Sequence, residues 1–508
     1  MLAKVKSVIN SRNGTAENNR SEMLVDAFDN RMFSSAEVPQ SLYPYTRPEF
    51  LHLNDEEIAL SADPNTRPVL CPKYPLTAFA GYAEVCNGGK SKQNEDSASA
   101  KVLSVMAESQ NYLSKLTQTR TRPVRVPSVG DEEILSMTPN ISSDEESNPQ
   151  VQATYFGLFD GHDGSGCSAM TANCLHEHIK NRLNGILYTA LNLPQITDVN
   201  HMNEITTNSL VIGALQVAFS EMDDQIAEMK TITRLSGGTT ALCALFFLNR
   251  LYIVNAGDSR AILVTPTEFQ QLSTDMNPQN DRKRLQYLAY QHRDLISPQF
   301  TRYEFSRSLT RKDLKSNVLY RDWWMDGWAT KIVTEADLKP QFISSHFKKS
   351  RLLNTIGVSR GLGDHHLMTY DNKIRIKPFL SCAPEVTVLD PSTFDRLSDD
   401  HVLIMATDGL FDIFSNADVA LIARQSLGSI PSDDMTRYTQ CAQELLTAAR
   451  GELHENSRWK LSAELKVGTP LDGSASMDDI TVFVIPLKFA FNMPNGGLDS
   501  DDEELLSC

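Results

Sequence analysis

Acidic residues sit beside short apolar runs at several distant places in the chain. "YFGLF" runs into Asp160-Gly161, "VLIMAT" runs into Asp408-Gly409, and Asp478 precedes "ITVFVIP". Strand ends can bring residues that are distant in sequence to one edge of a sheet, so this repetition predicts a cluster of carboxylates. Further acids in similar settings are expected to join it: Glu95, Asp96 and Asp258.

Such a cluster would have a defined chemistry. Carboxylates held close together repel one another, so either their pKa values rise or cations neutralise them. All-oxygen ligation favours Mg²⁺ or Mn²⁺ over zinc. Two such ions suit phosphoester hydrolysis, because they acidify a water molecule and stabilise charge on the phosphoryl oxygens. His162 could then protonate the departing alkoxide, and Gly161 lets the chain turn and offers a carbonyl ligand.

The elements that must position these residues can be read from the hydrophobic pattern. Short apolar runs separated by turn residues predict strands at 239–248, 250–257, 260–265, 401–409 and 479–486. Tight links between them favour antiparallel pairing. Helical patterns occur in separate groups at about 166–188, 208–230, 416–427 and 434–450. These helices are therefore expected to pack outside the sheets.

The composition excludes several classes of protein. The 508 residues carry a net charge of −16, which argues against a nucleic-acid binder, since phosphate backbones require a basic surface. The 8 cysteines form no CxxC pair, so no zinc site is expected. Free thiols in a reducing cytoplasm are expected instead. The N-terminus lacks the apolar core of a signal peptide, and the apolar runs are too short to span a bilayer.

Eight short motifs then occur in an order typical of one family: "NED" (94–96), "FDGHDG" (159–164), "SGGTTA" (236–241), "NAGDSRA" (255–261), "GVSRGLGD" (357–364), "APEV" (383–386), "ATDGLFD" (406–412) and "DDITV" (478–482). Through them the chain resembles the metal-dependent protein serine/threonine phosphatases of type 2C (the PPM family) over roughly 80–487. Flanking segments such as "RPEFL" and "LYRDW" resemble its H/J/M-type subgroup. The resemblance implies an α+β fold, a four-layer α-β-β-α sandwich of two antiparallel β-sheets flanked by helices.

The resemblance also implies roles for individual residues. Asp160 would bridge two Mg²⁺ or Mn²⁺ ions, and His162 would be the general acid. One ion would be completed by Glu95 and the carbonyl of Gly161, and the other by Asp408 and Asp478. Asp96 would hold metal-bound waters. A weaker third ion would bind to Asp258, Asp408 and Asp412.

Three positions depart from the family pattern. Where many members place a phosphate-binding arginine, this chain has Ser91, flanked by Lys90 and Lys92. We expect Lys90 to bind phosphate, with Lys92 as the alternative, although lysine lacks the bidentate fork of arginine. Asp479 stands where relatives often have asparagine, so Asp478 is taken as the ligand. Asp163 replaces a small residue and could raise the pKa of His162.

The predicted organisation has three parts. Residues 1–45 form a flexible segment, of which 1–12 could make an amphipathic helix that lies on a membrane. Residues 46–487 form the phosphatase domain, with a mobile loop at 102–150 and an enlarged flap insertion at 266–356. Residues 488–508 form an acidic disordered tail.

The flap carries an aromatic cluster with two interpretations: Tyr320, Trp323, Trp324 and Trp328. The cluster forms the flap's own small core, or it docks a folded phosphoprotein substrate. The subgroup resemblance implies phosphorylated Rab GTPases as substrates and attachment to Golgi-type membranes. The oligomeric state stays open.

Two other functions fit parts of the sequence. "GGKS" (88–91) resembles the end of a nucleotide-binding loop, but Glu84 stands where that loop requires its first glycine. A catalytically inactive scaffold of the same fold would have lost metal-binding acids, whereas this chain keeps an acid at each of those positions. Metal-dependent hydrolysis of phosphoserine and phosphothreonine on proteins is therefore the predicted function.

Overall fold

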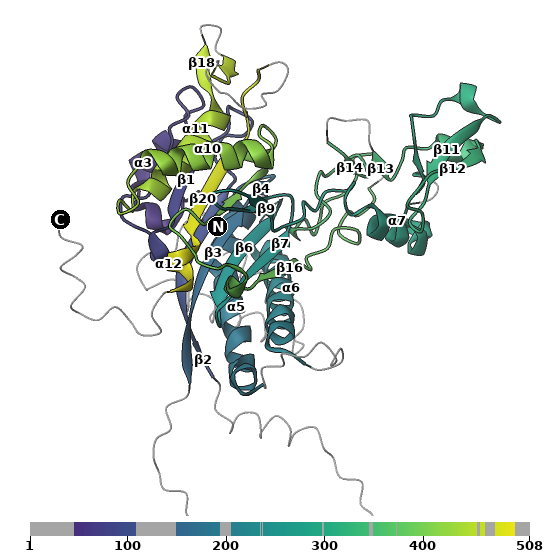
Figure 1. Cartoon of the computed structure of the whole chain (residues 1–508). Coiled ribbons are helices and arrows are strands. Elements are labelled where there is room, and N and C mark those ends of the chain that lie inside the picture. The colour runs from purple at the N-terminus through teal and green to yellow at the C-terminus, as the bar shows by residue number, and fades with distance from the viewer. Residues whose placement is uncertain are drawn as a thin grey trace, which may run out of the picture. The chain divides into compact units, whose positions relative to one another are not determined.

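Two five-stranded antiparallel sheets form the centre of the fold (Figure 1). The computed structural model describes residues 45–107, 149–193, 205–233, 235, 237–296, 299–344, 349–371, 373–454, 458–462 and 473–492. The first sheet has the spatial order β1 (Gly81–Val85), β20 (Ile480–Pro486), β17 (Val402–Ala406), β8 (Arg260–Val264) and β9 (Phe269–Gln271). The second has the order β16 (Glu385–Leu389), β7 (Arg250–Ala256), β6 (Ala241–Phe247), β3 (Gln150–Phe159) and β2 (Ser97–Met106).

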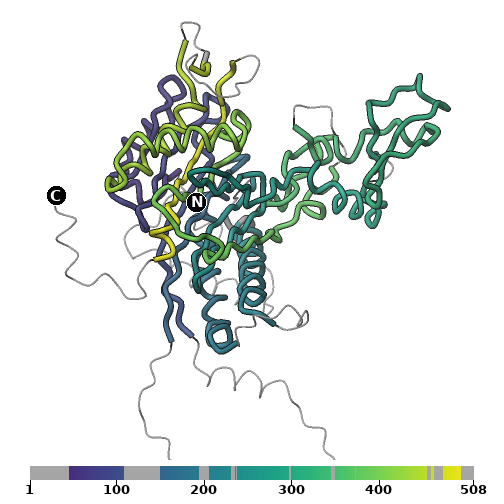
Figure 2. Tube along the Cα trace, viewed as in Figure 1, coloured from purple at the N-terminus to yellow at the C-terminus, as the bar shows by residue number. Residues whose placement is uncertain are grey.

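The first sheet joins segments from opposite ends of the described chain. β1 pairs with β20 in antiparallel register, with Gly81 opposite Val484 and Val85 opposite Ile480. Figure 2 shows this pairing as a purple trace beside a yellow one. The loops that follow β1 and precede β20 are therefore held side by side, and both carry predicted site residues.

Aromatic side chains fill the space between the two sheets. Tyr82 from β1, Phe156 from β3 and Phe483 from β20 are fully buried. The ring centroid of Phe483 lies 4.8 Å from that of Tyr82 and 5.6 Å from that of Phe156. Close packing of this kind leaves little freedom for the two sheets to shift, so the strand ends that carry the acids are fixed.

Two pairs of helices cover the outer faces. α5 (Gly166–Asn192) and α6 (Thr207–Thr233) lie against the second sheet, and α10 (Asn416–Ser429) and α11 (Arg437–Arg450) cover the first (Figure 1). Cys441 and Leu445 of α11 are buried against Val484 of β20 in one hydrophobic cluster. The α+β sandwich with the layer order α-β-β-α is confirmed, as are the four predicted helices.

The flap has secondary structure and a core of its own. It contains α7 (Arg282–Gln291), α8 (Arg293–Ile296) and a three-stranded sheet of β10 (Glu304–Phe305), β11 (Asn317–Arg321) and β12 (Ala329–Ile332), followed by β13 (Ile343–Ser344) and β14 (Arg351–Leu352). Phe305, Val318 and Val333 form a small buried cluster inside that sheet.

Short elements complete the described chain. They are η1 (Glu49–Leu51), α3 (Asp55–Ser61), η2 (Thr77–Phe79), β4 (Gly161–His162), β5 (Gly238–Thr239), η3 (Arg311–Asp313), η4 (Glu335–Leu338), β15 (Leu362–Gly363), η5 (Pro391–Thr393), α9 (Asp408–Phe411), β18 (Glu452–His454), β19 (Arg458–Lys460) and α12 (Leu487–Phe491). The strands β4, β5 and β15 form a separate small sheet beside the site.

Two predicted boundaries are wrong. Residues 102–106 and 150, predicted as parts of the loop at 102–150, lie in strands, because β2 continues to Met106 with Leu103 and Val105 buried, and β3 already starts at Gln150. Residues 488–491, predicted as the start of the tail at 488–508, belong to α12, which buries Leu487 and Ala490. Residues 108–148 and 493–508 lie outside the described residues, as do the segments 1–12 and 13–44.

Within the described ranges, no helix has both the length and the apolar character needed to cross a membrane. The 7 cysteines in those ranges are free thiols.

Candidate metal centre and active site

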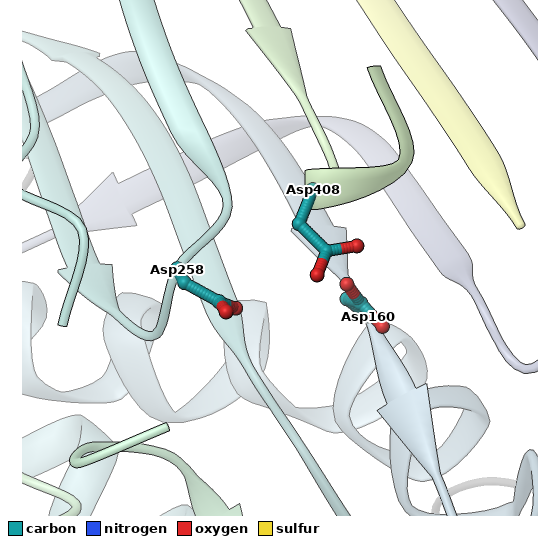
Figure 3. Close-up of side chains that lie close together, drawn as sticks. All are labelled: Asp160, Asp258 and Asp408. Atoms are coloured by element: carbon teal, nitrogen blue, oxygen red, sulfur yellow. The ribbon is translucent and has the colours of Figure 1, made fainter. Parts of the chain in front are cut away.

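Three aspartates from distant parts of the chain meet at the edge of the sandwich. Asp160 directly follows β3, Asp258 lies in the turn between β7 and β8, and Asp408 opens α9 after β17. One carboxylate oxygen from each lies within 4.8 Å of the others. Figure 3 shows the three carboxylates converging on one region. Strand ends from both sheets thus bring together three members of the predicted acidic cluster.

The proximity of these acids changes their protonation. Burial, followed by the charges of Asp408 and Asp96, raises the pKa of Asp160 well above the range of an ordinary carboxyl. Burial and the charge of Asp408 raise the pKa of Asp258 to about 8. Carboxylates that repel one another in this way form a suitable site for a divalent cation. Such a cation would bind their oxygens and offset their negative charge.

A lysine from the flap already offsets part of this charge. The Nζ atom of Lys349 lies 2.6 Å from Oδ2 of Asp408 and 2.6 Å from Oδ2 of Asp412. Burial and the charge of Asp408 still raise the pKa of Asp412. No pattern in the sequence points to Lys349, because it lies 59 residues before Asp408 in a segment without motifs.

The "NED" loop adds two acids with different settings. Oε1 of Glu95 accepts a hydrogen bond from the Gly164 main-chain nitrogen at 2.6 Å. Oδ2 of Asp96 accepts hydrogen bonds from the hydroxyls of Thr407 at 3.1 Å and Thr481 at 2.7 Å. Burial raises the pKa of both carboxyls, with that of Asp96 raised further by the charge of Asp479.

Gly161 lies so close to this loop that no other residue fits. A Cβ atom at this position would lie 2.3 Å from the main-chain oxygen of Glu95. The absence of a side chain therefore allows the chain after Asp160 to pass directly beside the "NED" loop. This close approach is what brings Glu95 to the same side of the molecule as Asp160.

Asp478 and Asp479, the adjacent acids before β20, make different contacts. Asp479 is buried and accepts hydrogen bonds from the main-chain nitrogens of Asn87 at 2.8 Å and Glu95 at 3.1 Å. Burial raises the pKa of Asp479 to about 6. Asp478 is half-buried, and its carboxylate forms an ion pair with Lys90. The exposed side chain of Lys92 lies two residues further along.

His162 faces a buried acid. Its Nε2 atom lies 2.8 Å from Oδ2 of Asp364, a carboxylate that is only 2% exposed. Burial alone would lower the pKa of His162, but the hydrogen bond and the charge of Asp364 outweigh it and raise this pKa. Asp364 ends the "GVSRGLGD" motif, and this motif is the one signal in the sequence for the acid, whose role was not predicted.

Comparisons with known proteins agree with this geometry. The model of the family described as "Protein phosphatase 2C" matches residues 131–346 and 339–457. Human protein phosphatase 1H is 40% identical over 88% of this chain and 91% of its own length. Mouse protein phosphatase 1J is 35% identical over 90% of this chain and 89% of its own.

A solved structure is also similar. The serine-threonine phosphatase 2C from Toxoplasma gondii is 15% identical, with a TM-score of 0.40, over 82% of this chain and 98% of its own. The resemblance to the PPM family is confirmed by the family match and by the two relatives with 35–40% identity.

The raised pKa of Asp258 gives a testable dependence of stability on pH. Its ordinary value is 3.8 and its value in the folded protein is about 8, so the folded state retains this proton longer than the unfolded state does. The resulting stability is fully present below pH 3.8 and is lost as pH rises through about 8. We expect Asp258→Asn to gain stability relative to the parent protein as pH rises across this window.

The measurement is urea unfolding with a chelator present at several pH values. Asp390→Asn is the matched control, because Asp390 pairs with Arg250 outside the acidic cluster. Parallel stability curves for the parent and Asp258→Asn would show that Asp258 titrates like an ordinary carboxyl.

Proposed function

Because the chain belongs to the protein phosphatase 2C family and is a protein serine/threonine phosphatase, we propose that it hydrolyses phosphoserine and phosphothreonine with the help of Mg²⁺ or Mn²⁺. The observation that carries this proposal is the convergence of the carboxylates of Asp160, Asp258 and Asp408 within 4.8 Å. The retention of every predicted acidic ligand argues against the inactive scaffold.

The donor set fits two hard cations and a weaker third. The residues proposed to hold them are Glu95, Asp96, Asp160, Gly161, Asp258, Asp408, Asp412 and Asp478. Bound Mg²⁺ or Mn²⁺ would supply an acidified water molecule and offset the negative charge of the phosphate. The carboxylates are held by strand ends and by hydrogen bonds from Gly164, Thr407 and Thr481, so the ligands are already oriented before a cation arrives.

The histidine supplies the proton that the leaving group needs. A serine or threonine alkoxide is a poor leaving group, and protonation of its oxygen lowers the barrier. The hydrogen bond and the charge of Asp364 raise the pKa of His162 despite its burial, which favours the protonated imidazole. We assign His162 as the general acid and Asp364 as the residue that orients it.

Lys90 is the better placed of the two predicted phosphate ligands. Its ion pair with Asp478 holds its ammonium beside the acidic cluster, and the charges of Asp478, Asp408 and Asp160 act on its pKa. Although burial alone would lower that pKa, these acids raise it, so the side chain stays charged. We therefore keep Lys90 as the proposed phosphate ligand and Lys92 as the alternative.

The flap aromatics support both interpretations of the sequence. The ring of Trp323 packs 5.0 Å from that of Tyr287, inside the flap. Trp324 is 65% exposed and Trp328 is 41% exposed. Residues 266–356 contain 15 Lys and Arg against 10 Asp and Glu, in a chain that is acidic as a whole. We propose that this basic, aromatic surface docks a folded phosphoprotein.

Three finer assignments stay predictions. These are phosphorylated Rab GTPases as substrates, attachment to Golgi-type membranes and a cytoplasmic location. The predicted membrane contact through residues 1–12 falls outside the described residues.

Metal dependence tests the proposal directly. We expect the parent protein to hydrolyse p-nitrophenyl phosphate with Mn²⁺ and to lose this activity when a chelator is added. Asp160→Ala should reduce kcat to the uncatalysed background, because this residue is proposed to contact both ions. Asp390→Ala is the control and should keep the parent activity. Turnover that persists in the presence of chelator would contradict the proposal.

The role of His162 is tested by comparing leaving groups. For His162→Ala we expect kcat on a phosphothreonine peptide to fall by about 100-fold or more, the usual contribution of a general acid. The loss on p-nitrophenyl phosphate should be much smaller, because nitrophenolate departs without a proton. Asp364→Asn should show the same selectivity in weaker form. Equal losses on both substrates would rule out a general acid at this position.

The docking surface is tested by Trp324→Ala. Loss of a central exposed tryptophan from a docking surface typically costs about tenfold in affinity or more. We expect kcat/KM on a phosphorylated Rab GTPase to fall accordingly, with p-nitrophenyl phosphate hydrolysis unchanged. Tyr74→Ala is the control, because Tyr74 is also 65% exposed but lies outside the flap. An unchanged kcat/KM for Trp324→Ala would place docking elsewhere.

A further inference from the structure

A fully buried arginine links the two loops on either side of the β1–β20 pair. Arg67 lies between α3 and β1, and its side chain has no exposure to solvent. Its Nε donates to the main-chain oxygen of Cys86 at 2.9 Å, and its Nη1 donates to that of Ser476 at 2.6 Å. Its Nη2 donates to the main-chain oxygen of Asp478 at 2.8 Å. Each of its three nitrogens thus bonds to a loop carbonyl.

This arrangement is unusual for a buried charge. Burial of a guanidinium is costly unless a carboxylate pairs with it. Arg47 follows that rule, because its Nε and Nη2 donate to the two carboxylate oxygens of Glu84 at 2.6 and 2.7 Å. Among the described residues, the side chain of Arg67 donates its hydrogen bonds to main-chain carbonyl oxygens only. An ion pair therefore does not account for its place in the core.

The surroundings of Arg67 hold it in one position. Its guanidinium lies 5.3 Å from the ring centroid of Trp459. Its main-chain oxygen accepts a hydrogen bond from Nη1 of Arg450 at 2.9 Å. Its φ of 42° lies in the left-handed region, which costs free energy for a residue with a side chain. A strained backbone that is fixed on several sides indicates that the position of this guanidinium matters.

The carbonyls that it binds belong to the loops of the candidate metal centre. Cys86 opens the loop that carries Lys90 and Glu95, and Ser476 precedes Asp478. A direct main-chain bond, from Gly88 nitrogen to Met477 oxygen at 3.0 Å, joins the same two loops. The planar guanidinium adds a fixed spacing between them, which the flexible ammonium of a lysine could not reproduce.

We propose that Arg67 is a positioning residue for Asp478: by holding the carbonyls of Cys86, Ser476 and Asp478 through one guanidinium group, it sets where the Asp478 carboxylate stands relative to Asp160 and Asp408. The inference rests on the proposed metal-dependent function. It gives the segment before β1 a role in positioning a ligand of the proposed metal centre. This segment lies outside residues 131–457, which match the family model.

The test measures Mn²⁺ binding to the folded full-length protein by titration calorimetry, together with thermal melting. Residues that orient metal ligands typically contribute about 10- to 100-fold to metal affinity. We expect Arg67→Met to raise the Kd for Mn²⁺ by at least about tenfold, with Arg67→Lys in between. At saturating Mn²⁺ both variants should recover most of the parent kcat on p-nitrophenyl phosphate.

Arg437→Met and Arg437→Lys are the matched controls. Arg437 is 2% exposed and donates to the Leu427 main-chain oxygen and to Asp400, away from the metal centre. These variants should lower the melting temperature and leave the Kd for Mn²⁺ unchanged. If folded Arg67→Met binds Mn²⁺ as the parent does, the positioning role is wrong and Arg67 only stabilises the fold.

Two further outcomes are distinguishable. If Arg67→Met does not fold, Arg67→Lys decides, because it keeps the buried charge and can donate to at least one carbonyl; a parent-like Kd in this variant overturns the proposal. If the unsubstituted protein itself binds no Mn²⁺, then the proposed metal centre fails, and this failure appears before any arginine is changed.

Discussion

Repulsion between carboxylates is the constraint around which this site is built. Asp160, Asp258 and Asp408 approach within 4.8 Å, and an arrangement of like charges this close is stable only if something offsets them. Protons do so through the raised pKa values of Asp160 and Asp258. Lysines do so through the ion pairs of Lys349 and Lys90. A divalent cation would replace these protons and ion pairs with one concentrated positive charge.

The sandwich keeps these acids together despite their mutual repulsion, because the acids lie at the ends of elements that cannot move apart. Their strands belong to both sheets, and the sheets are fixed to each other by a close-packed aromatic core around Phe483. Loops between the strands are also joined by buried hydrogen bonds. Asp479 bonds to the main chain at Asn87 and Glu95, and Arg67 bonds to Cys86 and Ser476. The favourable free energy of core packing thus offsets the repulsion between the carboxylates at the sheet edge.

The sequence was sufficient for the parts of this design that leave a local pattern. Apolar runs that end in an acid predicted the strands and the cluster of Asp160, Asp258 and Asp408, and helical periodicity predicted the four covering helices. The partners that the sequence analysis missed leave no such pattern. Asp364 meets His162 across 202 residues, and Arg67 meets the Asp478 carbonyl across 411. Their types are common, and only the completed fold determines which of many arginines and aspartates stands beside the site. The misplaced boundaries have a related cause, since the ends of β2 and the presence of α12 depend on burial against distant strands.

The contrast between Asp478 and Asp479 shows how the same side chain acquires different functions from its surroundings. Asp479 is enclosed, accepts two main-chain N–H groups and joins the loops of Asn87 and Glu95, so its oxygens are already occupied. Asp478 is half-buried, and within the described part of the chain its carboxylate pairs with the exposed ammonium group of Lys90, which a cation or a phosphate could displace. Lys349 stands in the same relation to Asp408 and Asp412, and it comes from the flap. The flap that carries the proposed docking surface thus also supplies an ammonium group that offsets charge at the acidic cluster.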